Sequence, residues 1–403
     1  MHTVKSAAVR ACMLLVGAST AAAAQVKLAG DAMTSVGPVF EVWKFGGGGI
    51  PQPTIDGGSS ITVTRASQWS IPVSVMVPIG SRFSVDLTTA YASSDVRISG
   101  TDPVTGTDGY SMSGIADVRL RATGHIIGDN VLLTAGLNLP TGETELNEEE
   151  LSALRVVGAP ALSFQVPVLG VGTGGTLGLV FAREFGAWSW ALGTSYEMRK
   201  QYTPISVAAG IPVDFSPGDA VRLSLGSSRL FGQHSMTFGF SADFFAKEEL
   251  ESGTSLGTAV GQSQLGPIYT ADWQFEVASS RLRELTFYAV DRYRTEYERE
   301  GKKVSDSDAN YLDVGVRAVA PLAAKTGLLI SVNGRHQTGL ASDDFLTTAG
   351  IASGSLTLGL QQRVGGNYSL QPFVRLQGGR LESGDASSTV TGFTGGLTIG
   401  ARF

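Results

Sequence analysis

Residues 115–126 read IADVRLRATGHI, an alternation of apolar and polar side chains. In a β-strand, successive side chains point to opposite faces. One face of this stretch would carry Val118, Leu120 and Ala122, and the other would carry Asp117, Arg119, Arg121 and His125. A half-buried strand of a soluble protein would show the same pattern as a strand between lipid and a watery lumen. The rest of the chain has to decide between the two.

The same period of two recurs along the chain, which predicts many strands. Clear examples are residues 69–77, 83–91, 188–199, 236–247, 271–277 and 356–363. Short turns fall at residues 80–81, 128–130, 185–186, 232–233, 279–280, 324–326 and 365–367, and longer polar or Gly-rich segments lie between them. Short connections at one end and long ones at the other are typical of outer-membrane barrels. We therefore predict an all-β fold, a transmembrane antiparallel up-and-down β-barrel of about sixteen strands, with fourteen as the alternative count.

The first 24 residues have the pattern of a secretory signal peptide. Lys5 and Arg10 precede a short apolar run, and residues 21–24 are all Ala. The run is too short for a comfortable transmembrane helix. We expect residues 1–24 to be a signal peptide and residues 25–403 to form one barrel domain. Because Cys12 is the only cysteine, the remaining chain offers neither a disulfide nor a thiolate metal site.

The composition excludes some classes of function. The 403 residues carry a net charge of −6, which argues against a nucleic-acid partner. Charged residues make up 16%, below the usual share of about 25%. The chain has 52 glycines and 42% hydrophobic residues, so neither disorder nor a standard soluble enzyme is expected.

Two features favour lipid over a protein core on the apolar faces. Aromatic residues lie near predicted strand ends, as in the girdles of membrane barrels: Trp69, Tyr91, Trp188, Tyr196, Tyr293, Tyr297 and Tyr368. The opposite faces carry more charge than a small packed interior tolerates. The predicted lumen-lining residues are Asp117, Arg119, Arg121, His125, Glu197, Arg199, Arg222, Asp243, Asp272, Glu276, Arg317 and Arg335, and the same argument adds Asp313, Arg363 and Arg375. Opposite charges on adjacent strands would neutralise each other, so no ion preference is expected.

The C-terminal strand has an aromatic end. Leu397, Ile399, Ala401 and Phe403 share a face. This ending resembles the C-terminal signature of Gram-negative outer-membrane proteins, which implies a cell outer-membrane location. It also implies that the barrel-insertion machinery recognises Phe403.

The segment 141–172 is the most distinctive predicted loop. Asn147 and Glu150 predict a helix N-terminus with a capping box. The residues that follow are unusually apolar for an extracellular loop, so we expect them to pack in the mouth or over the rim. They could form a lid or binding patch of Leu151, Leu154, Val157, Leu162, Val166 and Leu169, or they could serve only to stabilise the loop. Pro160, Pro167 and the glycines at 172–175 argue against a transmembrane helix here.

The sequence offers no catalytic or metal-binding motif and implies no cofactor. His125, His234 and His336 do not form a metal-ligand pair. The Gly-x-Ser-x-Gly match at residues 253–257 lies in a predicted long loop, not in the strand-to-helix turn that a nucleophile elbow needs. We read His125 and His336 as wall or rim histidines, although a rim-active enzyme would also be compatible with them.

Residues 65–202 resemble a family of outer-membrane channels for hydrophobic compounds, associated with phenol-degradation pathways and distantly similar to fatty-acid transporters. The resemblance is carried by residues 114–117 (GIAD), 137–142 (LNLPTG) and 172–175 (GTGG), and by a strand running to Tyr196 and Tyr202. It implies passive uptake of small apolar or aromatic solutes. A departure is that only about ten residues separate the expected cleavage site from the first strand candidate near Ser35, where fatty-acid transporters carry a plug. A general diffusion porin or a structural surface barrel would also fit this sequence.

Overall fold

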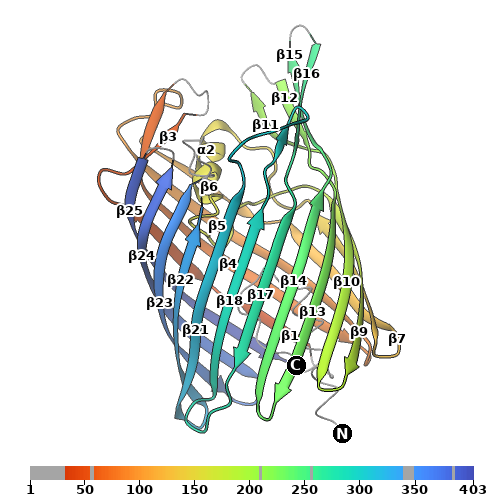
Figure 1. The fold of residues 1–403 in the computed structure, drawn as a ribbon. Helices are drawn as coiled ribbons and strands as arrows, with labels where there is room; N and C mark the ends of the chain where they lie inside the picture. Colours follow the sequence, from red (N-terminus) through yellow and green to blue (C-terminus); the bar gives the residue numbers. More distant parts are fainter. Residues whose placement is uncertain (1–31, 55–58, 208–210, 255–256, 339–348, 384–385) are drawn as a thin grey trace.

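The computed structural model describes residues 32–54, 59–207, 211–254, 257–338, 349–383 and 386–403. Within these residues, sixteen antiparallel barrel strands close into one β-barrel (Figure 1). In order they are β1 (Met33–Val36) with β2 (Val39–Phe45), β4 (Ser60–Ile79), β5 (Phe83–Ser99), β6 (Gly109–Ile115) with β7 (Val118–Ile127), β8 (Val131–Leu139), β9 (Gly174–Phe185), β10 (Trp188–Arg199), β13 (Ala220–Phe231), β14 (His234–Phe245), β17 (Ile268–Glu276), β18 (Glu284–Arg294), β21 (Ala309–Ala323), β22 (Thr326–Gln337), β23 (Gly350–Val364), β24 (Tyr368–Ser383) and β25 (Ala386–Arg402). The all-β barrel and the count of sixteen are confirmed. The predicted signal peptide lies outside the described residues and stays a prediction.

The first and last barrel strands close the barrel. β1 and β2 both pair antiparallel with β4 on one edge and with β25 on the other. The fourth barrel strand is also interrupted, because β6 and β7 both pair with β5 but only β7 pairs with β8. Closure leaves no barrel strand without a neighbour, as backbone groups in lipid require.

Short turns join the strands at the end of the barrel where β1 begins and β25 ends (Figure 1). Five of these turns carry a glycine with φ between 55° and 66°: Gly80, Gly128, Gly186, Gly232 and Gly365. A glycine adopts this left-handed conformation without the steric cost of a Cβ atom. The turn positions expected from the sequence are confirmed.

The longer connections gather at the opposite end. They hold β3 (Ile50–Pro53), which pairs with β4, and helix α2 (Glu148–Val157). A second antiparallel sheet rises above one side of the rim (Figure 1) and comprises β11 (Tyr202–Val207), β12 (Ile211–Ser216), β15 (Glu248–Thr254), β16 (Gly257–Gln264), β19 (Glu298–Arg299) and β20 (Lys302–Lys303). Among the described residues, no helix is long and apolar enough to cross a membrane.

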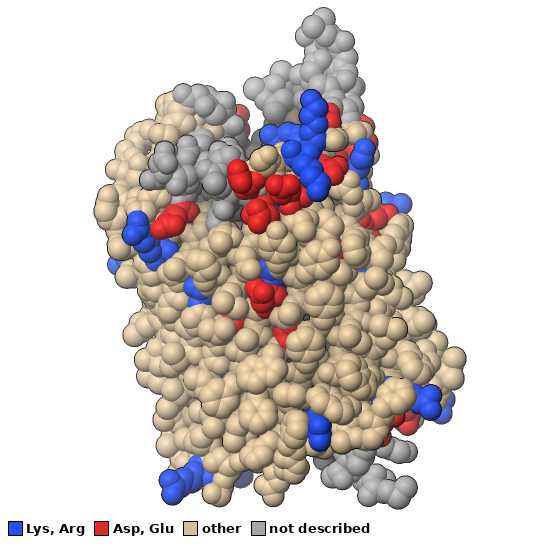
Figure 2. Space-filling view, in the orientation of Figure 1, with Lys and Arg blue, Asp and Glu red and all other residues tan. Residues whose placement is uncertain are grey.

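The outer face of the barrel is apolar. Large aliphatic side chains are exposed there, such as Leu137 (58%), Leu177 (58%) and Leu192 (63%). In Figure 2, most charges gather toward the two ends, and a broad band between them is largely free of charge. A closed barrel with such a band spans a bilayer, and barrels of this kind lie in the Gram-negative outer membrane. The protein is therefore an outer-membrane β-barrel, with its short turns periplasmic and its long loops extracellular.

Strand β7 contains most of residues 115–126 and shows both faces of the wall. Leu120 pairs with Leu137, whose side chain is exposed on the outer face. Arg121 lies on the lumen face, where its Nε is 3.1 Å from Asp86 Oδ2 on β5. The alternation in this stretch thus separates a lipid face from a lumen face.

Candidate functional site: the lumen and its mouth loop

The mouth loop, which we define as residues 140–173, leaves the barrel after β8 and returns at β9. Helix α2 begins in it with the expected capping box. Asn147 N donates to Glu150 Oε2 at 3.0 Å, and Glu150 N donates to Asn147 Oδ1 at 2.9 Å. The acidic first turn of α2 also suits the positive end of the helix dipole. The helix predicted from Asn147 and Glu150 is confirmed.

Apolar residues of the mouth loop pack on the inner wall of the extracellular half of the barrel. One buried cluster contains Val156, Leu162, Phe164 and Val166 from the loop, together with wall residues such as Trp43. The wall contributes from several neighbouring strands: Trp43 and Phe45 on β2, Val63 and Ala66 on β4, Val96 on β5, and Tyr110 and Met112 on β6. Each fully buried aliphatic side chain contributes about 1.5–3 kcal/mol. The loop therefore folds into the mouth.

The middle of the mouth loop is fixed to β2 and β4 by hydrogen bonds. The side-chain amide of Gln68 makes two hydrogen bonds with the backbone of Val166. Gln68 Nε2 donates to Val166 O at 2.7 Å, and Val166 N donates to Gln68 Oε1 at 2.8 Å. Glu41 Oε2 accepts from Gln165 N at 2.7 Å, and Trp43 Nε1 donates to Leu162 O at 2.9 Å. These three side chains occupy lumen-facing positions that sequence reasoning did not single out.

One further contact reaches the loop from β22, a distant strand in the barrel order. Arg335 Nη1 donates to Ser163 Oγ at 2.6 Å, and Arg335 Nη2 is 3.3 Å from Asp313 Oδ2. Ser163 has a φ of 50°, an uncommon conformation for a residue with a Cβ atom. The loop is thus held between β2 and β4 on one side and β22 on another, which narrows the lumen.

The two ends of the mouth loop meet at Asp117, which lies between β6 and β7 and is 5% exposed. Its Oδ1 accepts from Gly142 N at 2.8 Å. Its Oδ2 accepts from Val171 N and from Asn138 Nδ2, both at 2.8 Å. Asp117 was predicted to line the lumen, and its carboxylate instead serves as the anchor of the loop.

Two glycines allow the outgoing and returning ends of the mouth loop, which we call its first and second arms, to cross next to Asp117. A Cβ atom on Gly142 would lie 2.2 Å from Leu169 O, and one on Gly170 would lie 2.7 Å from Glu143 O. Backbone atoms cannot move aside as a flexible side chain can, so any larger residue would push the arms apart. The close crossing explains why glycine occupies both positions.

Most of the six residues of the predicted loop patch pack in the buried cluster between the mouth loop and the barrel wall. Val157, Leu162, Val166 and Leu169 are buried, whereas Leu151 and Leu154 are half-buried. The four buried side chains help to hold the loop in place, and a binding role for the patch stays a prediction. The exposed side chains of the middle segment are Ser163, Gln165 and Pro167.

The predicted lumen charges are mostly paired with an opposite charge on the wall. The pairs are Arg121–Asp86 (3.1 Å), Arg199–Glu197 (3.1 Å), Arg222–Asp243, Arg317–Glu284 (3.1 Å) and Arg335–Asp313 (3.3 Å). Four of the five join adjacent barrel strands, the neutralising arrangement that the alternating signs suggested. Such pairs keep the wall polar and leave little net field along it.

The remaining predicted wall residues have different surroundings. Asp272 lies against Gly239, where a Cβ would meet its Oδ1. Glu276 accepts from Ser235 Oγ at 2.9 Å and from Gln274 Nε2 at 3.2 Å. Arg119 is exposed in register with Thr88, and His125 is half-buried in register with Leu132.

Apolar and aromatic side chains also occur on the lumen wall. Tyr288 lies over Gly315, and Tyr311 donates to Asp313 Oδ2 at 3.1 Å. Nearer the periplasmic turns, Leu132, Val180, Ala182 and Ala191 form a small buried cluster. The half-buried Tyr288 and Tyr311 therefore offer contact surface for an apolar solute on a wall that also carries charge.

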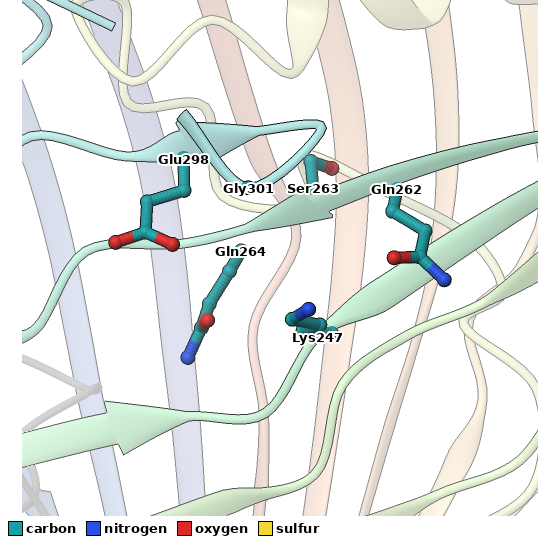
Figure 3. A pocket seen from close by; sticks show the side chains of 6 residues that line it. All are labelled: Lys247, Gln262, Ser263, Gln264, Glu298 and Gly301. Carbon is teal, nitrogen blue, oxygen red and sulfur yellow. The ribbon is translucent and has the colours of Figure 1, made fainter. Parts of the chain in front are cut away.

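A hollow in the extracellular sheet is lined by Lys247, Gln262, Ser263, Gln264, Glu298 and Gly301 (Figure 3). Its polar side chains are engaged within the sheet: Ser263 Oγ donates to Glu248 at 2.7 Å, and Gln262 Nε2 donates to Glu249 at 2.8 Å. This hollow is formed largely by residues of the extracellular sheet. Across the described residues, no group of three His, Cys, Asp or Glu side chains could hold a metal ion.

Comparison with protein-family models and with curated proteins gives no match. Among solved structures, the chain is similar to an outer-membrane channel from Pseudomonas putida F1, with 12% identity, a TM-score of 0.39, and 95% of this chain and 99% of that chain covered. It is similar to a Pseudomonas aeruginosa FadL homologue, with 12% identity, a TM-score of 0.43, and coverages of 92% and 90%. It is also similar to Pseudomonas aeruginosa OpdK crystallised with vanillate, with 11% identity, a TM-score of 0.44, and coverages of 92% and 99%.

Proposed function

We propose that this barrel is a passive outer-membrane channel for small hydrophobic or aromatic solutes. The observation that carries the proposal is the mouth loop, which is folded into the extracellular half of the lumen and fixed both at its ends and in its middle. A sixteen-stranded barrel is wide enough for an aqueous channel. A loop held inside that channel leaves a narrower route, in which a solute touches the wall.

The lumen wall supports a neutral solute better than an ion. Most of its predicted charges occur in pairs of opposite sign, which weakens any preference for one sign of ion. Tyr288 and Tyr311, both half-buried, provide aromatic contacts on the lumen wall. No energy-coupling element enters the proposal, and the solute would move down its concentration gradient. We propose no catalytic role for the wall or rim histidines.

The test is the uptake of a labelled neutral aromatic solute, such as toluene, by cells that carry this barrel as their sole added channel. Uptake should saturate with concentration, and replacement of residues 147–170 by a short Gly-Ser linker should abolish the saturation. A matched variant that shortens residues 249–262, in the extracellular sheet, should keep it. Non-saturable uptake in the unmodified protein would contradict the proposal.

A general diffusion porin is the second candidate, because sixteen strands and a charged wall also suit a water-filled pore. Single-channel current in a planar bilayer separates the two. A porin should give a large ion current that an added aromatic solute does not change. The proposed channel should give a small current that the solute reduces and that rises when residues 147–170 are replaced.

A further inference from the structure

Three cations lie side by side on the outside of the barrel, near its extracellular end. Lys44 on β2 is the cross-strand partner of Arg65 on β4, and Arg65 is in turn the partner of Arg97 on β5. Directly opposite residues on neighbouring strands have their Cβ atoms about 4.5–5.5 Å apart. The three charged groups therefore form a continuous basic row across three strands.

The alternation of the strands places this row on the outer face. Trp43, Ala66 and Val96, the chain neighbours of the three cations, are buried in the cluster beneath the mouth loop. Side chains adjacent in a strand point to opposite faces, so the cations point away from the lumen. Lys44 is exposed, and the side chain of Arg97 is 65% exposed.

The height of the row matches the headgroup layer of the membrane. On the same outer face of β4 and β5, Trp69 and Tyr91 are 44% and 43% exposed and mark the aromatic girdle. Arg65 lies four residues beyond Trp69, which is about 13 Å along the strand. With a strand tilt of about 40°, the rise along the membrane normal is roughly 10 Å. The outward residues Ser67 and Asp95, between the girdle and the row, are already polar.

Among the described residues, the acids near the row do not balance its three positive charges. Like charges directly opposite each other destabilise a sheet. Asp95 is the acid nearest in register, and its Oδ1 is 3.6 Å from Arg97 Nε, with both side chains more than half exposed. Such an exposed pair contributes little. Farther along the same rim, Arg380 has its own acid, Glu382, at 3.2 Å.

We propose that Lys44, Arg65 and Arg97 form a binding site for the phosphate groups of a phosphorylated glycolipid in the extracellular leaflet. A phosphate monoester carries a charge of about −1.5 to −2 at neutral pH, which complements the excess of two positive charges left after Asp95 is counted. Arginine binds phosphate oxygens through two parallel N–H groups, and lysine adds a point charge. The lipid supplies the counter-charge that this part of the sheet lacks.

The test uses the full barrel in detergent, titrated with diphosphoryl lipid A, with bound lipid counted by native mass spectrometry. The variant Lys44→Gln/Arg65→Gln/Arg97→Gln should bind at least about tenfold more weakly. The control variant Arg299→Gln/Lys302→Gln/Lys303→Gln removes three cations from the extracellular sheet and should bind as the unmodified protein does. Lipid A without its phosphates should bind weakly to all three proteins.

Equal affinity of the unmodified protein and the Lys44/Arg65/Arg97 variant would overturn the proposal. So would equal binding of phosphorylated and dephosphorylated lipid A, because the apolar wall alone would then account for it. A third arm adds inorganic phosphate at 1 mM, roughly physiological; complete displacement of the lipid would assign the site to free phosphate. The single variant Arg65→Gln, at the centre of the row, should fall between the unmodified protein and the triple variant.

Discussion

Replacement of Asp117 by alanine should release the ends of the mouth loop. The carboxylate of Asp117 accepts three hydrogen bonds: from Gly142 N in the first arm of the loop, from Val171 N in the second arm, and from the side chain of Asn138 on β8. Alanine keeps the backbone bond from residue 117 N to Leu169 O but removes all three of these contacts. The two loop amides would then be left without their acceptor.

The size of the effect follows from the kind of contact that is lost. A hydrogen bond to a charged group contributes about 1.5–3 kcal/mol, and contacts within one network do not add fully. We therefore expect a loss on the order of 3–5 kcal/mol in the local stability of the loop. The buried Val157, Leu162, Val166 and Leu169 remain, so the loop should still occupy the mouth most of the time and open more often.

Limited proteolysis measures this opening. Arg155 is the only Lys or Arg between residues 140 and 173, so trypsin has one site in the loop. When opening is fast relative to cleavage, the cleavage rate follows the population of the open form. A loss of about 3 kcal/mol should accelerate cleavage at Arg155 on the order of a hundredfold. The ion current through the channel should become larger or noisier in the same variant.

The control is Asp243→Ala, which removes a different lumen carboxylate, the partner of Arg222 on the neighbouring strand. It should leave cleavage at Arg155 unchanged. A heat-modifiable band on a denaturing gel would show that both variants form the barrel. If Asp117→Ala barrels resist trypsin as well as the unmodified protein does, Asp117 does not anchor the loop. If Asp243→Ala accelerates cleavage equally, the effect is a general loss of barrel stability.

Three further predictions concern the mouth. Gly142→Ala should accelerate cleavage at Arg155, because the new Cβ would lie 2.2 Å from Leu169 O; Gly80→Ala, in a periplasmic turn, serves as the control. Trp43→Phe removes the 2.9 Å bond to Leu162 O and leaves a cavity where part of the buried indole lay, so it should cost about 2–3 kcal/mol of loop stability by the same assay. In loop 100–108, burial acts to raise the pKa of Asp102, but hydrogen bonds from Tyr110, Val104 and Thr105 outweigh it, so its pKa is lowered. The contribution of Asp102 to stability is therefore complete above the ordinary carboxyl pKa of about 4 and is lost as pH falls through the lowered value. Hydrogen exchange of residues 102–107 would detect this loss. The variant Asp102→Asn should abolish the pH dependence.

The barrel could be predicted from local patterns because each barrel strand repeats the same rule. Turn glycines such as Gly128 and Gly186 mark the short connections, and the alternation between them sets the two faces. Helix α2 could also be predicted from a local pattern, because the capping residues Asn147 and Glu150 are only three residues apart. Such features depend on neighbouring residues alone, so they are visible without any knowledge of the tertiary contacts.

The part of the lumen wall on which the mouth loop packs could not be predicted in this way. The lumen-facing positions of β2 are occupied by Val39, Glu41, Trp43 and Phe45, a mixture of acid and aromatic that fits neither water nor lipid. The mixture makes sense only when the loop covers it, because Glu41 and Trp43 bind backbone atoms more than a hundred residues away. A pattern read along one strand gives the face of a residue but not the chain that packs on that face.

The short motifs that carry the resemblance to hydrophobic-compound channels have a common physical role in this barrel. Asp117 ends the first motif, Asn138 and Gly142 belong to the second, and the third begins at Gly172, directly after Val171; all of them meet at the anchor. The Asn138 amide also donates to Gly172 O, which fixes the returning arm. In this barrel these motifs therefore hold the two ends of the mouth loop in place. Selectivity depends on side chains that stay exposed when the loop is in place, such as Gln165 and Pro167. Substitutions at these two positions should therefore change which solutes pass. Substitutions at Asp117 should instead change how freely all solutes pass.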